Sequence, residues 1–197
     1  MGTPTREKLL DAGLQLLLER GYNGLGIQEL LRTTQAPKGA FYHHFESKQD
    51  FALQVVDRYM EEVHQGLKLC LEDDSLPPLE RIRRFFELSR DKYSRDGYLG
   101  CMLGGLGQEL SGTHEAFRTR IEACFAFIAD RFADCIEQAR LRGEVADSTD
   151  PLEAANLLLD CWEGGALRCR LWRDPEPLNR VLDFCFGSLR AEAASTV

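Results

Sequence analysis

Two short stretches of the sequence carry side chains suited to binding or reacting with a partner. The first, Pro37–His44, reads PKGAFYHH and supplies one long cation, a phenol and two imidazoles. The second is Gly100-Cys101, where a thiol precedes a run rich in glycine and leucine. A cationic and aromatic helix face is suited to a phosphate-lined groove. A cysteine at a helix start is favoured as the reactive thiolate.

The first stretch predicts a short helix after a turn. Pro37 fixes its own φ and lacks an N–H, so it suits the first position of a helix that begins at about Lys38. Phe41 and Phe45 are four residues apart and can be buried on one face. The residues left on the other faces are Lys38, Gly39, Ala40, His43 and His44. The plain alternative is an amphipathic helix with solvated histidines.

Helical periodicity dominates the sequence around this stretch. Thr3 or Thr5 can cap a first helix that runs to about Arg20, where Gly21 ends it. A second helix stops near Thr33, and a turn then leads to the Pro37 helix. Three short helices, with about four residues between the last two, predict a helix-turn-helix arrangement.

The run from Gly21 to Phe51 resembles the DNA-binding domain of the TetR family of bacterial repressors. The family pattern is present as Gly21-Tyr22, Gly39, Tyr42-His43-His44-Phe45 and Ser47-Lys48, and the similarity covers roughly residues 5–55. The resemblance implies these DNA-binding residues: Gln28, Lys38, Gly39, Ala40, Tyr42, His43, His44 and Lys48. Lys38, Gly39 and Ala40 would enter the major groove. Gly26 and Pro37 depart from the pattern, and Gly26 removes one expected phosphate contact.

Charge is divided unevenly along the 197 residues. The net charge is −8, yet residues 1–50 hold six Lys/Arg and six Asp/Glu, so all of the net acidity follows residue 50. A neutral head on an acidic body permits DNA binding through the head alone. The seven cysteines all follow that head and lack C-x-x-C spacing, which indicates reduced thiols. We find no apolar span or signal segment and expect a cytoplasmic protein with no membrane partner.

The rest of the chain predicts an all-α fold of about nine helices. Ser47-Lys48-Gln49-Asp50 has capping-box spacing and should start a long helix to about Cys70. Later helices are expected from about Leu79 to Tyr93, from Glu115 to Arg142, from Asp150-Pro151 to about Trp172, and from Pro175 or Pro177 onward. We therefore predict a DNA-binding domain at residues 1–47 and a ligand-binding and dimerisation domain at residues 48–197.

The Gly100-Cys101 run predicts a helix with one side of small residues. Met102, Leu103, Leu106 and Leu110 fall on its apolar side, whereas Cys101, Gly104, Gly105 and Gln108 fall on the other. The small side either packs closely on a helix or leaves room for a ligand. The segment resembles the TetR-family branch that senses electrophiles such as N-ethylmaleimide, in which a cysteine after glycine is the sensor. Cys101 matches that residue, and relatives can also keep the motif without its chemistry.

We expect an effector pocket and a dimer interface in the acidic body. The predicted sensor and ligand residues are Cys101, Gly105, Gln108, Phe125 and Trp162. Surplus apolar surface on the last two helices predicts a homodimer. Its predicted interface residues are Leu158, Trp162, Cys169, Leu182 and Phe184.

The favoured function is a dimeric repressor that a small molecule or electrophile releases from a palindromic operator. We expect no enzyme activity, no cofactor and no metal site, because the sequence lacks a Gly-x-Ser-x-Gly motif, metal-ligand spacing and a nucleotide loop. One alternative is an activator or adaptor with a DNA-binding head. The other is a thiol enzyme that pairs Cys101 with His114 or His64.

Overall fold

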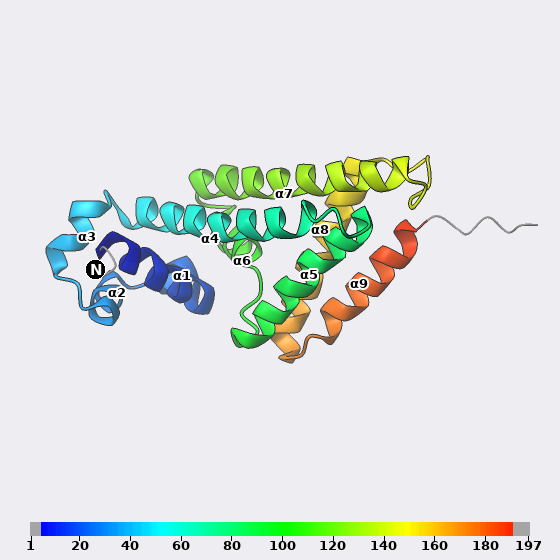
Figure 1. The fold of residues 1–197 in the computed structure, drawn as a ribbon. Helices are drawn as coiled ribbons and strands as arrows, with labels where there is room; N and C mark the ends of the chain where they lie inside the picture. The colour runs from blue at the N-terminus through cyan, green and yellow to red at the C-terminus, as the bar shows by residue number, and fades with distance from the viewer. Residues whose placement is uncertain (1–4, 191–197) are drawn as a thin grey trace, which may run out of the picture. The chain divides into compact units, whose positions relative to one another are not determined.

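The computed structural model describes residues 5–190, and within this range it contains nine helices (Figure 1). The helices are α1 Thr5–Gly24, α2 Ile27–Thr34, α3 Lys38–His44, α4 Lys48–Leu71, α5 Pro78–Arg95, α6 Met102–Leu110, α7 Glu115–Leu141, α8 Pro151–Trp172 and α9 Glu176–Leu189. The extended pairing in the described range is one isolated bridge between Val145 and Arg190. The all-α prediction is confirmed, whereas the proposed cap Thr3 lies outside the described residues.

The helices form two compact units. The head unit comprises the described residues up to 63 together with residues 101–122, and the body unit comprises residues 64–100 and the chain from residue 123 onward. α4 and α7 therefore contribute turns to both units. The head unit contains α6 as well as α1 to α3, so it is larger than the segment 1–47 named above. That domain boundary stays a prediction.

In the head unit, α1 is interrupted where the sequence predicts its end. Gly21 has φ 70° and ψ −178°, a conformation that breaks the helix before one last turn reaches Gly24. The apolar side of α1 is buried, with Leu9 fully covered and Leu17 3% exposed. α1 also approaches α4 closely, since a Cβ added at Gly13 would lie 3.0 Å from Val55 Cγ2. This close approach anchors α1 to the long helix that follows the helix-turn-helix.

The helix-turn-helix is held by backbone caps and a cluster of phenylalanines. Gln35 adopts φ 54° and ends α2. Pro37 is the N-cap of α3, whereas the sequence predicted it at the first helical position. Phe41 and Phe45 are buried as expected, and the ring of Phe51 packs against both at centroid distances of 5.3 and 4.8 Å. The short helix α3 is thus fixed to the start of α4.

The start of α4 is capped in the way the sequence predicts. Ser47 Oγ accepts the Asp50 N–H at 3.0 Å, and the Asp50 carboxylate accepts the Glu46 N–H at 3.0 Å. This pattern is a capping box whose return bond is displaced by one residue. This cap fixes Lys48 as the first residue of α4.

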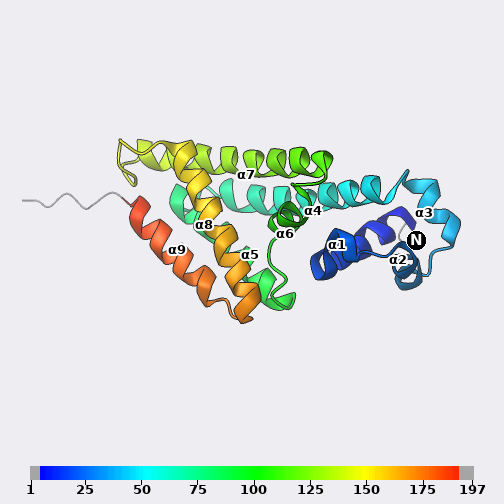
Figure 2. The same ribbon diagram turned by 180° about the vertical axis from the view of Figure 1, so that it is seen from behind.

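In the body unit, α8 and α9 run antiparallel beside each other (Figure 2). The Asp150 carboxylate accepts the N–H groups of Leu152 and Glu153 at 2.9 and 3.0 Å and so starts α8. On the inner side of α8, Trp162 packs on Phe86 of α5 with ring centroids 4.5 Å apart. Across residues 5–190, no helix combines the length and apolarity that a membrane crossing requires.

Candidate nucleic-acid interface

An open hollow of about 770 Å³ lies over α2, α3 and the start of α4 in the head unit. Four of the eight predicted DNA-binding residues line it, namely Gln28, Lys38, Tyr42 and Lys48. The remaining lining residues are Gly26, Ile27, Leu31, Arg32 and Ala36. The structure therefore brings together a side-chain amide, a phenol and three cations, and no carboxylate lines this surface.

Two of the cations around the hollow keep most of their charge available to a partner. Lys48 Nζ lies 4.7 Å from the centroid of the Tyr22 ring, a cation–π contact that does not neutralise the charge. Arg32 approaches Glu29 only at 3.7 Å and keeps an 80% exposed side chain. Glu29 also pairs with Arg20, which draws its charge toward α1. The hollow thus presents positive charge although the first 50 residues are neutral overall.

The other four predicted residues lie on α3 but do not line the hollow. Gly39 and His43 are exposed, whereas Ala40 and His44 are half-buried. The rings of the two histidines contact each other edge-on at 4.9 Å. A Cβ added at Gly39 would meet no described atom of the head unit within 4 Å, so the packing of this unit does not require glycine there. A glycine in open space is suited to the close approach of a partner.

Sequence reasoning missed Arg32, which belongs to the same surface. Its position offered a signal, because Arg32 follows Gln28 by four residues and so lies on the same helix face. The departure at Gly26 is visible in the structure. Gly26 is the N-cap of α2 and provides no side-chain capping bond. The first N–H groups of α2 therefore receive no capping bond from the side chain of the N-cap residue.

Cys101 occupies the N-cap position of α6, as its place before the helical run predicts. The thiol is half-buried, and its Sγ lies 3.8 Å from the Tyr59 hydroxyl of α4, within hydrogen-bond reach for sulfur. Sequence reasoning did not identify Tyr59, because no local pattern connects residues so far apart. On the small side of α6, Gly105 and Gln108 are exposed, whereas Leu103 and Leu106 are buried.

The five predicted sensor and ligand residues divide between the two units. Cys101, Gly105 and Gln108 belong to the head unit, and Phe125 and Trp162 belong to the body unit. Phe125 is half-buried, whereas Trp162 is 4% exposed. Besides Phe86, the Trp162 ring contacts Tyr93 at 6.0 Å, so this side chain is a core residue of the body unit.

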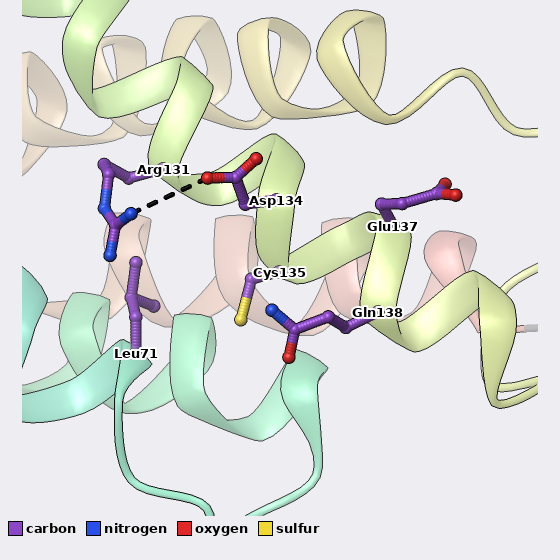
Figure 3. A pocket seen from close by; sticks show the side chains of 6 residues that line it. All are labelled: Leu71, Arg131, Asp134, Cys135, Glu137 and Gln138. Atoms are coloured by element: carbon purple, nitrogen blue, oxygen red, sulfur yellow. Dashed lines mark ion pairs between the residues drawn. The ribbon is translucent and has the colours of Figure 1, made fainter.

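A second hollow, of about 270 Å³, lies in the body unit between the end of α4 and α7 (Figure 3). Its lining residues are Leu71, Arg131, Asp134, Cys135, Glu137 and Gln138. Arg131 pairs with Asp134 at 3.6 Å within the hollow. Cys135 donates to the Pro78 carbonyl at 3.4 Å, and burial raises the pKa of this thiol to about 11. Charges that pair with each other and a protonated thiol offer little to a ligand.

The predicted dimer residues differ in burial. Leu158, Trp162, Cys169 and Leu182 are all at most 4% exposed, because they fill the core of the same chain. Their side chains are therefore covered before any second copy arrives. Phe184 is 72% exposed, and it shares the outer surface of α8 and α9 with a further apolar set: Leu152, Leu157, Leu167, Leu171 and Trp172. The outer faces of α8 and α9 are therefore better candidates for the interface than their inner faces.

Comparisons with known proteins agree with the geometry of the head. Residues 9–55 match the family described as "Bacterial regulatory proteins, tetR family", and residues 78–185 match "Tetracyclin repressor-like, C-terminal domain". The chain is 34% identical to the HTH-type transcriptional repressor DhaR of Mycobacterium sp. (strain GP1), over 95% of this chain and 93% of that protein. It is 31% identical to the HTH-type transcriptional repressor NemR of Escherichia coli (strain K12), over 90% of both chains.

Solved structures give the same result. The regulatory protein TetR from Rhodobacter sphaeroides superposes with a TM-score of 0.90 at 33% identity, covering 96% of this chain and all of that one. The reduced form of E. coli NemR superposes with a TM-score of 0.87 at 31% identity, covering 96% of this chain and 98% of that one. A helix-turn-helix head, a matching C-terminal domain and repressors as relatives over nearly the full length lead to one assignment: the chain belongs to the TetR family of transcriptional regulators.

Proposed function

We propose that this protein is a homodimeric repressor that binds a palindromic operator and releases it when Cys101 reacts with an electrophile. The observation that carries the DNA-binding part is the positively charged hollow that brings Gln28, Lys38, Tyr42 and Lys48 together. Side chains of this kind bind phosphates and position a recognition helix in the major groove. Because a repressor must reach its operator, we propose that the protein acts in the cytoplasm.

In the proposed complex, the start of α3 reads the bases. Lys38 and the open backbone at Gly39 lie at this helix start, where side chains of a recognition helix meet base edges. Lys48, Tyr42 and Arg32 surround it and contact phosphates, which sets the orientation of the helix. Each head alone offers few cations, so tight binding requires two heads on two half-sites.

The second head comes from a second copy of the chain. The exposed apolar side chains on the outer faces of α8 and α9 form a patch that a monomer would leave in water. In a two-fold dimer the same patch on two copies covers itself, giving a four-helix interface. Phe184 and Leu157 are 72% and 62% exposed, and we propose that they lie in this interface.

Cys101 is the proposed sensor because of its position and accessibility. It lies at the N-terminus of α6, where the helix dipole stabilises a thiolate, and it is half-buried where Cys124, Cys135, Cys169 and Cys185 are buried. The similarity to NemR, which has been solved in a form described as reduced, supports thiol chemistry as the signal.

The test is DNA binding with and without alkylation. An operator is selected from a random duplex library, and its affinity is measured before and after treatment with N-ethylmaleimide. We expect specific binding that the reagent weakens, and a Cys101→Ser variant that binds DNA but no longer responds. Cys161→Ser is the matched control, because Cys161 is also half-buried. Absence of a selected sequence would refute DNA reading, and an unchanged response of Cys101→Ser would refute the sensor.

A further inference from the structure

Glu109, in the last turn of α6, binds the backbone at the break in α1. Its carboxylate accepts the Tyr22 N–H through Oε2 at 2.8 Å and the Asn23 N–H through Oε1 at 2.7 Å. Tyr22 and Asn23 precede Glu109 by 87 and 86 positions in the sequence, and all three residues belong to the head unit. Charge-assisted bonds of this length are among the stronger hydrogen bonds in proteins. We call this arrangement the Glu109 clamp.

The turn at Gly21 is shaped to receive this carboxylate. Gly21 adopts φ 70°, which interrupts α1 and leaves the next two N–H groups free to donate outside the helix. A Cβ at this position would lie 3.0 Å from Glu109 Cδ and would overlap Oε2. The backbone conformation therefore favours glycine before Tyr22, and any larger residue there would displace the Glu109 carboxylate.

Tyr22 connects the Glu109 clamp to the DNA-facing hollow. Lys48 Nζ lies over its ring, and Lys48 lines the hollow. On other sides the Tyr22 ring packs edge-on against Phe117 at 5.2 Å and His114 at 5.5 Å. A shift of the Tyr22 backbone therefore changes the support beneath one of the three cations.

The other end of the same helix holds the thiol. α6 has nine residues and is about 14 Å long at 1.5 Å per residue. Its apolar side, with Leu103, Leu106 and Leu110, is buried. Cys101 and Glu109 thus lie at opposite ends of one short helix inside the head unit.

We propose that Glu109 is a positioning residue that couples Cys101 to the DNA-binding surface. When a maleimide reacts, the sulfur forms a bond to one alkene carbon, the π bond breaks, and the thiol proton ends on the neighbouring carbon. The added group beside the Tyr59 hydroxyl displaces the start of α6. The Glu109 carboxylate moves with the helix, and the Tyr22-Asn23 turn loses its two acceptors. This inference rests on the proposed function and names the contacts through which a reaction at Cys101 would affect the DNA-binding surface.

The first measurement follows the two amides directly. Hydrogen exchange of the Tyr22 and Asn23 N–H groups is recorded for the full-length protein before and after N-ethylmaleimide. We expect both amides to be protected before the reaction and to exchange about tenfold faster or more after it. The amides of Leu30 and Leu31, buried in α2, serve as the internal reference and should change little. If DNA is released while both amides stay protected, the inference is overturned.

The second measurement uses a matched pair of variants. Glu109→Gln removes the charge and one acceptor, whereas Glu122→Gln removes the same charge from an exposed position of the head unit. We expect alkylation to weaken operator binding by about tenfold or more in the wild type and in Glu122→Gln, and by less than about threefold in Glu109→Gln. Glu109→Asp keeps both acceptors and should restore part of the response.

The outcomes separate this inference from the proposed function. If the wild type does not bind DNA or is not released by the reagent, the proposed function fails. If the wild type responds and Glu109→Gln responds equally, the function stands and the coupling role of Glu109 is refuted. A Glu109→Gln variant that unfolds leaves the decision to the exchange measurement on the wild type.

Discussion

Lys48 Nζ lies 4.7 Å from the centroid of the Tyr22 ring, so the first residue of α4 is held by the residue that follows the break in α1. The contact retains the positive charge of Lys48 while restricting its side chain. Burial raises the pKa of the Tyr22 phenol, which keeps the ring neutral beneath the ammonium group. An oriented lysine at a helix start is a suitable phosphate contact.

Removing Arg32 or Lys48 should reduce both the DNA affinity and its dependence on salt. Each phosphate contact releases about one counterion, so we expect the slope of log affinity against log salt to fall by roughly 1 for each alanine variant. Lys68→Ala is the control, because Lys68 is an exposed lysine in the body-unit part of α4. A fluorescence-anisotropy titration at several salt concentrations gives the slopes. Equal slopes in all three variants would exclude Arg32 and Lys48 as phosphate contacts.

Replacing Gly21 by alanine should destabilise the protein more than the same change at Gly97. Both glycines have a positive φ, 70° and 76°, so both variants carry backbone strain of about 1 to 3 kcal/mol. Only Gly21 faces a carboxylate, whereas a Cβ at Gly97 meets no described atom of the body unit within 4 Å. We expect an additional cost of roughly 1 to 3 kcal/mol at Gly21 from the displaced hydrogen bonds.

Urea unfolding of the two glycine variants measures this difference. The double variant Gly21→Ala, Glu109→Ala provides the control for the overlap, because it removes the carboxylate that the new methyl group would meet. Its free energy of unfolding should exceed the value expected from adding the two single effects. Strict additivity would show that Gly21 is required by its backbone conformation alone.

A charged residue at Phe184 should prevent dimer formation. Phe184→Glu places a carboxylate in the proposed interface, whereas Leu69→Glu makes a similar change at an exposed leucine of α4. We expect the first variant to sediment as a monomer and the second as a dimer, because an unpaired charge cannot be desolvated cheaply. The monomer should also bind operator DNA at least about tenfold more weakly, since one head contacts one half-site. A dimeric Phe184→Glu would place the interface elsewhere.

The buried thiol of Cys135 should make stability fall at alkaline pH. Burial raises its pKa from an ordinary value of 9.0 to about 11, so the neutral thiol is favoured in the folded state. The stabilisation is fully present below pH 9 and is lost as the pH rises toward 11, by up to about 1.4 kcal/mol per pH unit. Cys135→Ser retains a hydrogen-bond donor and does not ionise in this range.

The measurement is the free energy of unfolding of both proteins at pH 8 and at pH 10.5. The difference at pH 8 reports the cost of the serine hydroxyl in the core. We expect this difference to shrink by roughly 1 to 2 kcal/mol at pH 10.5, because only the wild type loses stability through this thiol. A difference that is the same at both pH values would show that Cys135 does not titrate.

The helices could be predicted from the sequence because their signals are local. Phe41 and Phe45 at a spacing of four, the Ser47-to-Asp50 cap and Asp150-Pro151 each determine structure within a few residues, and each appears in the structure as expected. The proposed DNA-binding residues were predicted from their match to a family pattern. Arg32 lay outside that pattern and was missed, although its spacing from Gln28 would have identified it.

Contacts between distant helices could not be predicted in the same way. Nothing near Glu109 in the sequence indicates that its carboxylate binds the Tyr22 and Asn23 amides. For α8, apolar residues around most of the circumference showed that two sides must be covered, but did not show which side packs within the chain. Leu158 and Cys169 were therefore assigned to the interface although they lie in the core.

The position of α6 in the head unit has a consequence for how the protein is made. Residues 101–122 complete a unit whose other part ends at residue 63, so the ribosome releases the DNA-binding helices long before the segment that completes them. The Tyr22 and Asn23 amides gain their acceptors only once residue 109 has been translated. Contacts between residues so far apart in the sequence form slowly, so the head unit of the nascent chain is completed late. The head unit is therefore complete only once the helix that carries the proposed sensor thiol has been made.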